Sequence, residues 1–178
     1  MTILGILGMP AVSEEMIIDA VDRRDSPIGE VKRSEVFKER LNFRVVHILL
    51  FNGRGELLVQ QLANDRTRHP RYWGSSVAGY LFAGESYEAA AQRRLSQELG
   101  VFNSRLAPVG KTSMSDEGCL KFIGVFSAVS EGPFSFDGEH ISALEFVSLP
   151  EIHKLHNQGS VAFTPTFIRV LDFYENWR

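Results

Sequence analysis

The sequence has little that would support a disulfide, a zinc site or a membrane span. It contains one cysteine, Cys119, which excludes an intrachain disulfide and a zinc site built from several cysteines. No apolar run reaches the roughly 18 residues that a bilayer crossing needs. The formal charge is −3 and the isoelectric point is near 6.0, so electrostatics favour neither a nucleic-acid nor a membrane partner. We expect a protein of a reducing compartment, the cytoplasm.

The composition is that of an ordinary folded protein. The chain has 178 residues, of which 44% are hydrophobic and 23% charged, and this excludes a disordered or low-complexity chain. The length is typical of one domain that buries its own core. The first residues are apolar but lack the basic start of a signal peptide. We therefore interpret residues 1–15 as an N-terminal extension and residues 16–178 as a single domain.

Strand and helix patterns alternate along the chain and predict a mixed α/β domain. Branched and aromatic residues indicate strands at 16–22, 43–51, 56–61, 105–112, 119–129 and 143–148. Turns or loops are expected at 23–29, 52–55 and 62–75, and residues 30–41 are charged and partly helical. One helix is predicted over 86–99, with Ser86 and Gly100 as caps, and another from Pro165 to Tyr174. His47, inside an apolar strand, is expected to be a core histidine with a hydrogen-bond partner.

The segment from Gly79 to Val101 carries the chemistry. A loop with glycine and glutamate leads into a helix on which Arg94 and Glu98, four residues apart, share one face. Carboxylates beside a glycine loop can hold a hard divalent cation through side-chain and backbone oxygens. The spacing resembles the Nudix box, a pattern far more specific than a lone glycine motif. The matching residues are Gly79, Glu85, Arg93, Leu95, Glu98, Gly100 and Val101.

The resemblance implies the Nudix fold, a mixed β-sheet sandwiched between α-helices, and metal-dependent hydrolysis of a diphosphate bond. In that family three carboxylates of this helix gather magnesium or manganese, which polarise the diphosphate and activate water. Arg94 and Gln97 replace two of them here, and the positive charge of Arg94 would weaken metal binding. We therefore expect a single Mg²⁺ or Mn²⁺, with Glu98 as the catalytic carboxylate. By resemblance, the metal ligands are Glu98, Glu85 and the carbonyl of Ala78, and the structural residues are Gly79, Arg93 and Gly100.

The chain also resembles the type 1 isopentenyl-diphosphate isomerases, which share the Nudix fold. Some of them carry Arg-Arg at the position of Arg93 and Arg94, and the similarity covers roughly residues 16–172. The isomerase's working cysteine, histidines and carboxylates nevertheless fall on or near residues without the required chemistry. These are Ala78, Tyr80, Val36, Phe43, Cys119 and Lys121. The chain is therefore more similar to the uncharacterised Nudix hydrolases that resemble the isomerases.

Residues outside the box are expected to complete the site. Nudix hydrolases often take a catalytic base or another metal ligand from a loop, and Glu139 is the preferred candidate, with Asp116 and Glu117 as alternatives. Arg66 and Arg94 are expected to bind phosphate oxygens, because a guanidinium group makes bidentate contacts with them. Arg66 also lies where isomerase relatives place a diphosphate-binding lysine.

Each of these residues also has a purely structural interpretation. Arg93 and Glu85 can form a salt bridge that fastens the loop to the helix. Arg94 and Glu98 can be an ordinary surface pair, worth about 0.3–0.5 kcal/mol. The basic residues of the segment 66–71 can belong to a solvated loop.

Three functional hypotheses follow from these residues. The first is a hydrolase of a diphosphate bond in a nucleoside-diphosphate-linked or similar small molecule. The second is a catalytically impaired Nudix domain that binds a diphosphate ligand or a protein partner. The third, favoured least, is an isomerase-like enzyme with relocated groups. A homodimer is implied by the resemblance alone.

Overall fold

The computed structural model describes residues 16–136 and 138–178, so the extension predicted over residues 1–15 lies outside it. The elements, in chain order, are β1 (Ile17–Val21), β2 (Pro27–Lys32), η1 (Arg33–Glu35), β3 (Phe43–Phe51), β4 (Leu57–Leu62), β5 (Trp73–Gly74), β6 (Val77–Tyr80), α1 (Tyr87–Leu99), β7 (Ala107–Asp116), β8 (Cys119–Val129), β9 (Ile141–Val147), α2 (Leu149–Asn157) and α3 (Pro165–Trp177).

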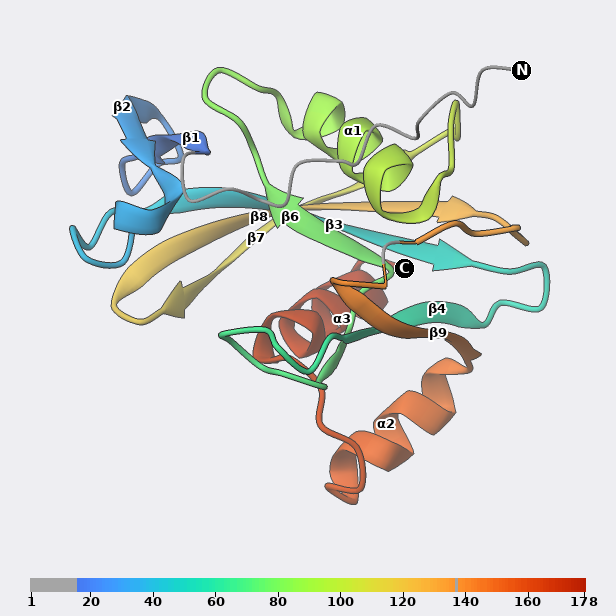
Figure 1. Ribbon diagram of the computed structural model, residues 1–178. Helices are drawn as coiled ribbons and strands as arrows, with labels where there is room; N and C mark the ends of the chain where they lie inside the picture. Colours follow the sequence, from blue (N-terminus) through green and yellow to red (C-terminus); the bar gives the residue numbers. More distant parts are fainter. Residues whose placement is uncertain (1–15, 137) are drawn as a thin grey trace, which may run out of the picture.

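A mixed seven-stranded sheet lies between helices, as the sequence predicts. Its strand order is β5-β4-β3-β8-β7, with β6 paired to β3 and β9 paired to β4. Helix α1 covers one face, while α2 and α3 pack on the other (Figure 1). The β1–β2 hairpin forms a separate two-stranded sheet. No helix within the described part of the chain is long and apolar enough to cross a membrane. That residues 16–178 form a single domain stays a prediction.

Strand β3 contributes to the core on both faces of the sheet. Val46 and Ile48 pack towards α1, whereas Val45 and Leu49 pack towards α3, as the alternation of a strand requires. The strand pairs in parallel with β8 and antiparallel with β6. Because β6 leads directly into the loop before α1, this pairing fixes where the loop begins.

Helix α1 begins and ends where the local signals predict. The Oγ atom of Ser86 accepts a hydrogen bond from the backbone N–H of Ala89 at 3.1 Å. Gly100 ends the helix at φ 65°, in the left-handed region that favours glycine. Leu95 and Leu99 are fully buried against the sheet, and such burial contributes about 1.5–3 kcal/mol per side chain. The packing sets which face of the helix turns towards the loop.

Two segments differ most from the sequence expectation, while the short strands β5 and β6 fall within and just after the expected loop 62–75. Residues 27–32, expected as the end of a turn and the start of a partly helical segment, form β2, because they pair with β1 along its length. Only Arg33–Glu35 become helical, as a single 3₁₀ turn. The nine-residue helix α2 was not expected, although Ser148 caps it and a proline stands in its first turn.

Gly124 allows α1 to lie close to β8, and this contact gives a test of the fold. A Cβ atom at Gly124 would lie 2.3 Å from Cδ1 of Tyr87, the first residue of α1. We expect Gly124→Ala to lower the free energy of unfolding by about 1–3 kcal/mol, because overpacking forces the ring or the helix to shift. Gly29→Ala is the matched control, since a Cβ atom there meets nothing within 4 Å. Urea denaturation of both variants measures the difference, and equal stabilities would contradict the close contact.

Candidate functional site

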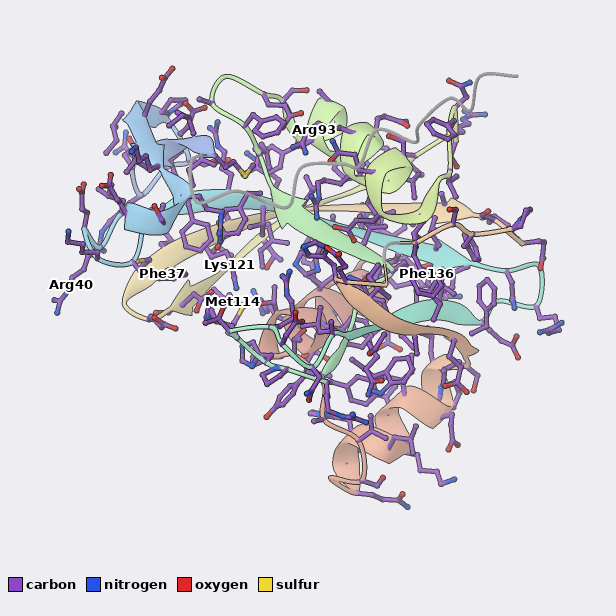
Figure 2. All side chains as sticks on the ribbon, in the orientation of Figure 1. Phe37, Arg40, Arg93, Met114, Lys121 and Phe136 are labelled. Carbon is purple, nitrogen blue, oxygen red and sulfur yellow. The ribbon has the colours of Figure 1, made fainter. Side chains whose placement is uncertain are left out.

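Arg93 fastens the loop between β6 and α1 to the helix. Its Nε and Nη2 atoms donate to the two carboxylate oxygens of Glu85, each at 2.7 Å, and Nη2 also donates to the carbonyl of Tyr80 at 3.1 Å. The guanidinium group lies 3.9 Å from the ring centroid of Phe82, and Figure 2 shows Arg93 on the loop side of α1. Burial opposes ionisation of Glu85, but Arg93 and the N–H of Phe82 hold its pKa below the usual value. A role for Glu85 as a metal ligand would therefore require Arg93 to move away.

Arg94 turns into the protein. Its Nη2 atom donates to the carbonyl oxygen of Ala78 at 3.1 Å and forms an ion pair with Oε1 of Glu98. The side chains of Arg94 and Glu98 are only 16% and 14% exposed, so they are not the ordinary surface pair considered from the sequence. The Arg94 side chain crosses Gly79 so closely that a Cβ atom there would lie 2.2 Å from Nε. A glycine at position 79 is therefore necessary for this placement of Arg94.

The positive charges of Arg94 and Arg66 both act on the carboxylate of Glu98. Burial raises the pKa of Glu98, while the positive charges of Arg94 and Arg66 lower it. Arg93 and Arg94 pair with Glu85 and Glu98, and Arg66 adds a further positive charge that acts on Glu98. The balance of charge therefore favours an anionic ligand.

The residues of the box do not form a multi-carboxylate metal centre. Within residues 16–136 and 138–178, no group of three or more His, Cys, Asp or Glu side chains is placed to hold a metal ion. The carboxylate of Glu98 and the carbonyl of Ala78 nevertheless converge on one point, because both accept from Nη2 of Arg94. Oxygens of these two kinds are ligands that a hard divalent cation accepts, and in this structure both accept from Arg94.

A hollow of about 600 Å³ lies between the loop after β4 and the segment before β9. Its lining includes both Glu139, the predicted loop carboxylate, and Asp65, the neighbour of Arg66 in the chain. Asp65 was not predicted as a site residue, because no pattern in the sequence distinguishes it from other loop acids. The lining residues are Ala63, Asn64, Asp65, Gly138, Glu139 and Ser142.

The alternative loop carboxylate, Asp116, belongs to a different cluster. Its Oδ1 atom accepts from Arg68 at 2.5 Å and its Oδ2 atom from Nζ of Lys121 at 2.7 Å. Lys121 also donates to Oγ1 of Thr166 at 2.6 Å, and Figure 2 shows it on β8. Glu117 lies at the rim of the cluster, 3.3 Å from Arg68. These partners hold Asp116 in a structural network whose charges also act on Tyr80, the residue after Gly79.

The positions where the isomerases keep their working groups also come together. Phe43 stacks on Tyr80 with ring centroids 5.4 Å apart, and it stands beside Lys121 in the pairing of β3 with β8. Sγ of Cys119 lies 4.0 Å from the carbonyl of Val36. The positions to which the resemblance assigns the isomerase's groups thus hold two aromatic rings, a buried thiol and a lysine.

His47 is a core histidine with a partner, as the sequence predicts. Its Nδ1 atom lies 2.8 Å from Oγ of Ser75. Burial, with a smaller contribution from the charge of Lys121, lowers the pKa of His47 to about 3. The ring is therefore neutral at physiological pH.

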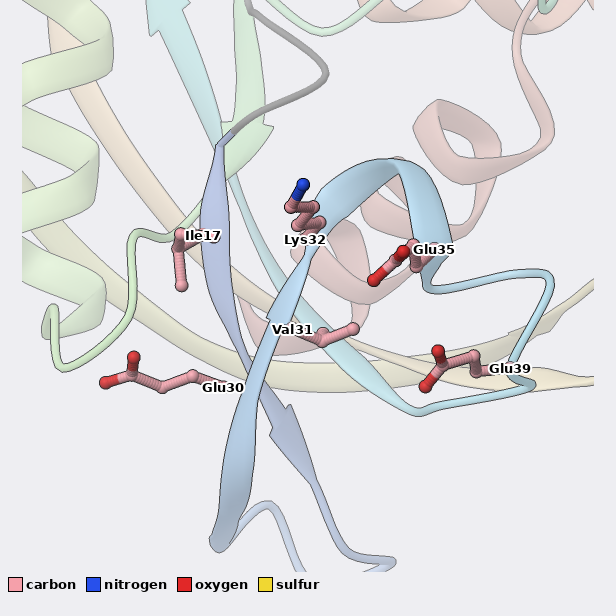
Figure 3. A pocket seen from close by; sticks show the side chains of 6 residues that line it. All are labelled: Ile17, Glu30, Val31, Lys32, Glu35 and Glu39. Carbon is pink, nitrogen blue, oxygen red and sulfur yellow. The ribbon is translucent and has the colours of Figure 1, made fainter.

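A second hollow, of about 390 Å³, lies beside the β1–β2 hairpin (Figure 3). None of the predicted site residues lines it. Its lining residues are Ile17, Glu30, Val31, Lys32, Glu35 and Glu39.

Comparison with known proteins gives a consistent result. The NUDIX domain profile matches residues 41–167. The uncharacterized Nudix hydrolase PA4841 of Pseudomonas aeruginosa is 35% identical over 92% of this chain and 96% of its own length. An isopentenyl-diphosphate Delta-isomerase of Streptomyces avermitilis is 29% identical over 90% of this chain and 84% of its own. The crystal structure of DR0079 from Deinococcus radiodurans superposes with a TM-score of 0.77 at 24% identity, covering 89% of this chain and 99% of that one.

Proposed function

Because this chain belongs to the NUDIX domain family, we propose that it hydrolyses a diphosphate bond in a small molecule such as a nucleoside diphosphate linked to another group. Proteins of the family act on small molecules and generally use divalent metal ions. The observation that carries the proposal is the position of Glu98, a buried carboxylate that the family box places beside the carbonyl of Ala78.

The residues of the site suit the parts of this reaction. Arg66 and Arg94 would hold the phosphate oxygens, because guanidinium groups make charge-assisted contacts with them. Glu98 and the carbonyl of Ala78 would hold one Mg²⁺ or Mn²⁺, which neutralises charge on the diphosphate when bound. Glu139, on the wall of the hollow, would orient the attacking water.

Glu85 enters the metal set only if Arg93 releases it. In the present arrangement the Arg93–Glu85 pair supports the loop. Gly79 allows Arg94 to approach the backbone closely, and Gly100 ends helix α1. Arg93, Gly79 and Gly100 are therefore proposed as structural residues of the box.

Turnover of a panel of nucleoside-diphosphate compounds with Mg²⁺ or Mn²⁺ tests the proposal. We expect Glu98→Gln to lower kcat/KM by roughly 100-fold, as expected when a group that stabilises charge in the transition state is removed. Glu88→Gln is the matched control, because Glu88 is an exposed acid in the first turn of the same helix. Circular dichroism should show both variants folded. If the wild type turns over no faster than Glu98→Gln on any compound, hydrolysis at this site is excluded.

A second candidate function is binding of a diphosphate without hydrolysis, or binding of a protein partner. It is favoured by the ion pair between Arg94 and Glu98, which occupies the remaining carboxylate. It is also favoured by Gln97, because Arg94 and Gln97 together replace two of the three family carboxylates of the helix. It predicts that a diphosphate ligand raises the melting temperature without being consumed, because binding to the native state stabilises it. Glutamates placed at 94 and 97 would then increase hydrolysis. Efficient hydrolysis by the wild type would contradict this function.

Isomerisation is the least supported function. The isomerase relative is similar along most of the chain, but Tyr80 and Lys121 stand where its chemistry would be needed. We expect no conversion of isopentenyl diphosphate in the presence of Mg²⁺.

We further propose a cytoplasmic location, which the buried free thiol of Cys119 supports. The homodimer implied by the resemblance stays a prediction that analytical ultracentrifugation would test.

A further inference from the structure

Arg94 occupies the position at which the box offers oxygens to a cation. One atom, Nη2, contacts both the carbonyl of Ala78 and the carboxylate of Glu98. The side chain reaches this point because Gly79 has no Cβ atom to obstruct it. Both oxygens are therefore already satisfied by a positive charge that belongs to the protein.

A free divalent ion would meet strong opposition at this position. It would have to share the single negative charge of Glu98 with Arg94, in a largely buried site that Arg66 makes more positive. A diphosphate changes this balance, because its oxygens carry several negative charges and accept hydrogen bonds from guanidinium groups. In the present position Nε of Arg94 is buried without a hydrogen-bond partner among the described residues, so a move towards phosphate breaks no hydrogen bond that the structure shows at that atom.

We propose that Arg94 is an internal counter-ion that closes the cation position of the box, so that a divalent ion enters only together with a diphosphate. The guanidinium group leaves Glu98 and Ala78 when phosphate oxygens accept its hydrogen bonds, and the two freed oxygens then hold the ion. This inference rests on the diphosphate site of the proposed function. Linkage requires that the ion and the diphosphate strengthen each other's binding by the same factor.

The closed state is tested with Mn²⁺ alone. We titrate the full chain with Mn²⁺ and follow the electron paramagnetic resonance signal of the free ion. The wild type should bind weakly, and Arg94→Gln should bind at least about tenfold more tightly, because both oxygens are released. Adding Glu98→Gln to Arg94→Gln should abolish the gain. Arg105→Gln, which removes an exposed guanidinium group outside the box, should behave as the wild type.

Gly79→Ala provides a second route to the same test if Arg94→Gln does not fold. The added Cβ atom would displace the Arg94 side chain without removing its charge. The φ angle of Gly79 lies outside the left-handed region, so the backbone permits alanine at this position. A gain in Mn²⁺ binding by Gly79→Ala supports the proposal. Wild-type protein that binds Mn²⁺ alone as tightly as Arg94→Gln overturns it.

Coupling is tested with methylenediphosphonate, a diphosphate analogue that cannot be hydrolysed. By calorimetry, Mg²⁺ should tighten its binding to the wild type by about tenfold or more, and the effect should disappear in Glu98→Gln. Equal binding with and without Mg²⁺, or no binding at all, overturns the coupling. Absence of turnover with intact coupling would contradict only hydrolysis, so the two failures are distinguishable.

Discussion

Asp116→Ala is expected to lower the free energy of unfolding by about 3–5 kcal/mol, because it leaves a buried ammonium group without its counter-charge. The side chains of Lys121 and Asp116 are each 9% exposed and lie 2.7 Å apart. Burial and the charge of Arg68 lower the pKa of Lys121, whereas Asp116 raises it. Without Asp116, the hydroxyl of Thr166 is the one hydrogen-bond partner left to Nζ within residues 16–136 and 138–178. Urea denaturation at pH 7 measures the loss.

Two comparisons separate this effect from a simple loss of contacts. Asp116→Leu combined with Lys121→Met removes both charges, and we expect it to recover most of the stability, because a buried ion pair can be replaced by apolar residues of similar volume. Arg68→Gln should cost less than about 1 kcal/mol, because Arg68 is 41% exposed and water screens its pairing. A loss below about 1 kcal/mol for Asp116→Ala would show that water reaches Lys121.

Acidification is expected to destabilise the protein through His47. In the folded state its pKa is about 3, below the 6.5 of an ordinary histidine, so the unfolded state binds more protons between these values. The free energy of unfolding therefore falls as the pH decreases through this window. The expected loss is roughly 2 kcal/mol between pH 7.5 and pH 5, and roughly 4–5 kcal/mol when protonation is complete.

Urea denaturation of the wild type and of His47→Gln across this pH range isolates the contribution of the ring. The variant should lose less stability than the wild type between pH 7.5 and pH 5. His156→Gln, which changes an exposed histidine, should follow the wild-type curve. Parallel curves for the wild type and His47→Gln would show that His47 accepts a proton without unfolding.

Much of the fold was predictable because its signals are local. The strand 43–51 has the predicted bounds, since an unbroken run of branched and aromatic residues fits a strand buried on both faces. Helix α1 was predictable from its caps, Ser86 and Gly100. Strand β2 was not, because its residues contain turn-forming types and become a strand only through pairing with β1.

The candidate site was predictable in its spacing but not in its contacts. The box pattern placed Arg93 with Glu85, because the loop length brings them together. It did not show that Arg94 would turn inward, since that depends on the space above Gly79. The Lys121–Asp116 pair was also missed. Lys121 shares one face of β8 with the buried Ile123 and Val125, and a lysine in such an apolar series could have indicated a buried ion pair.

The parallel pairing of β3 with β8 has a consequence for synthesis of the chain. On the edge of β3 that faces β8, Phe43 has no paired strand until Lys121 has been made, roughly 80 residues later. At ribosomal rates this delay is several seconds. During that time a nine-residue segment with almost no charge stays open to pairing with other strands, a property that promotes aggregation. Pairing with β6 closes only the opposite edge of β3, so the β8-facing edge is most open to other strands before residue 121 has been made.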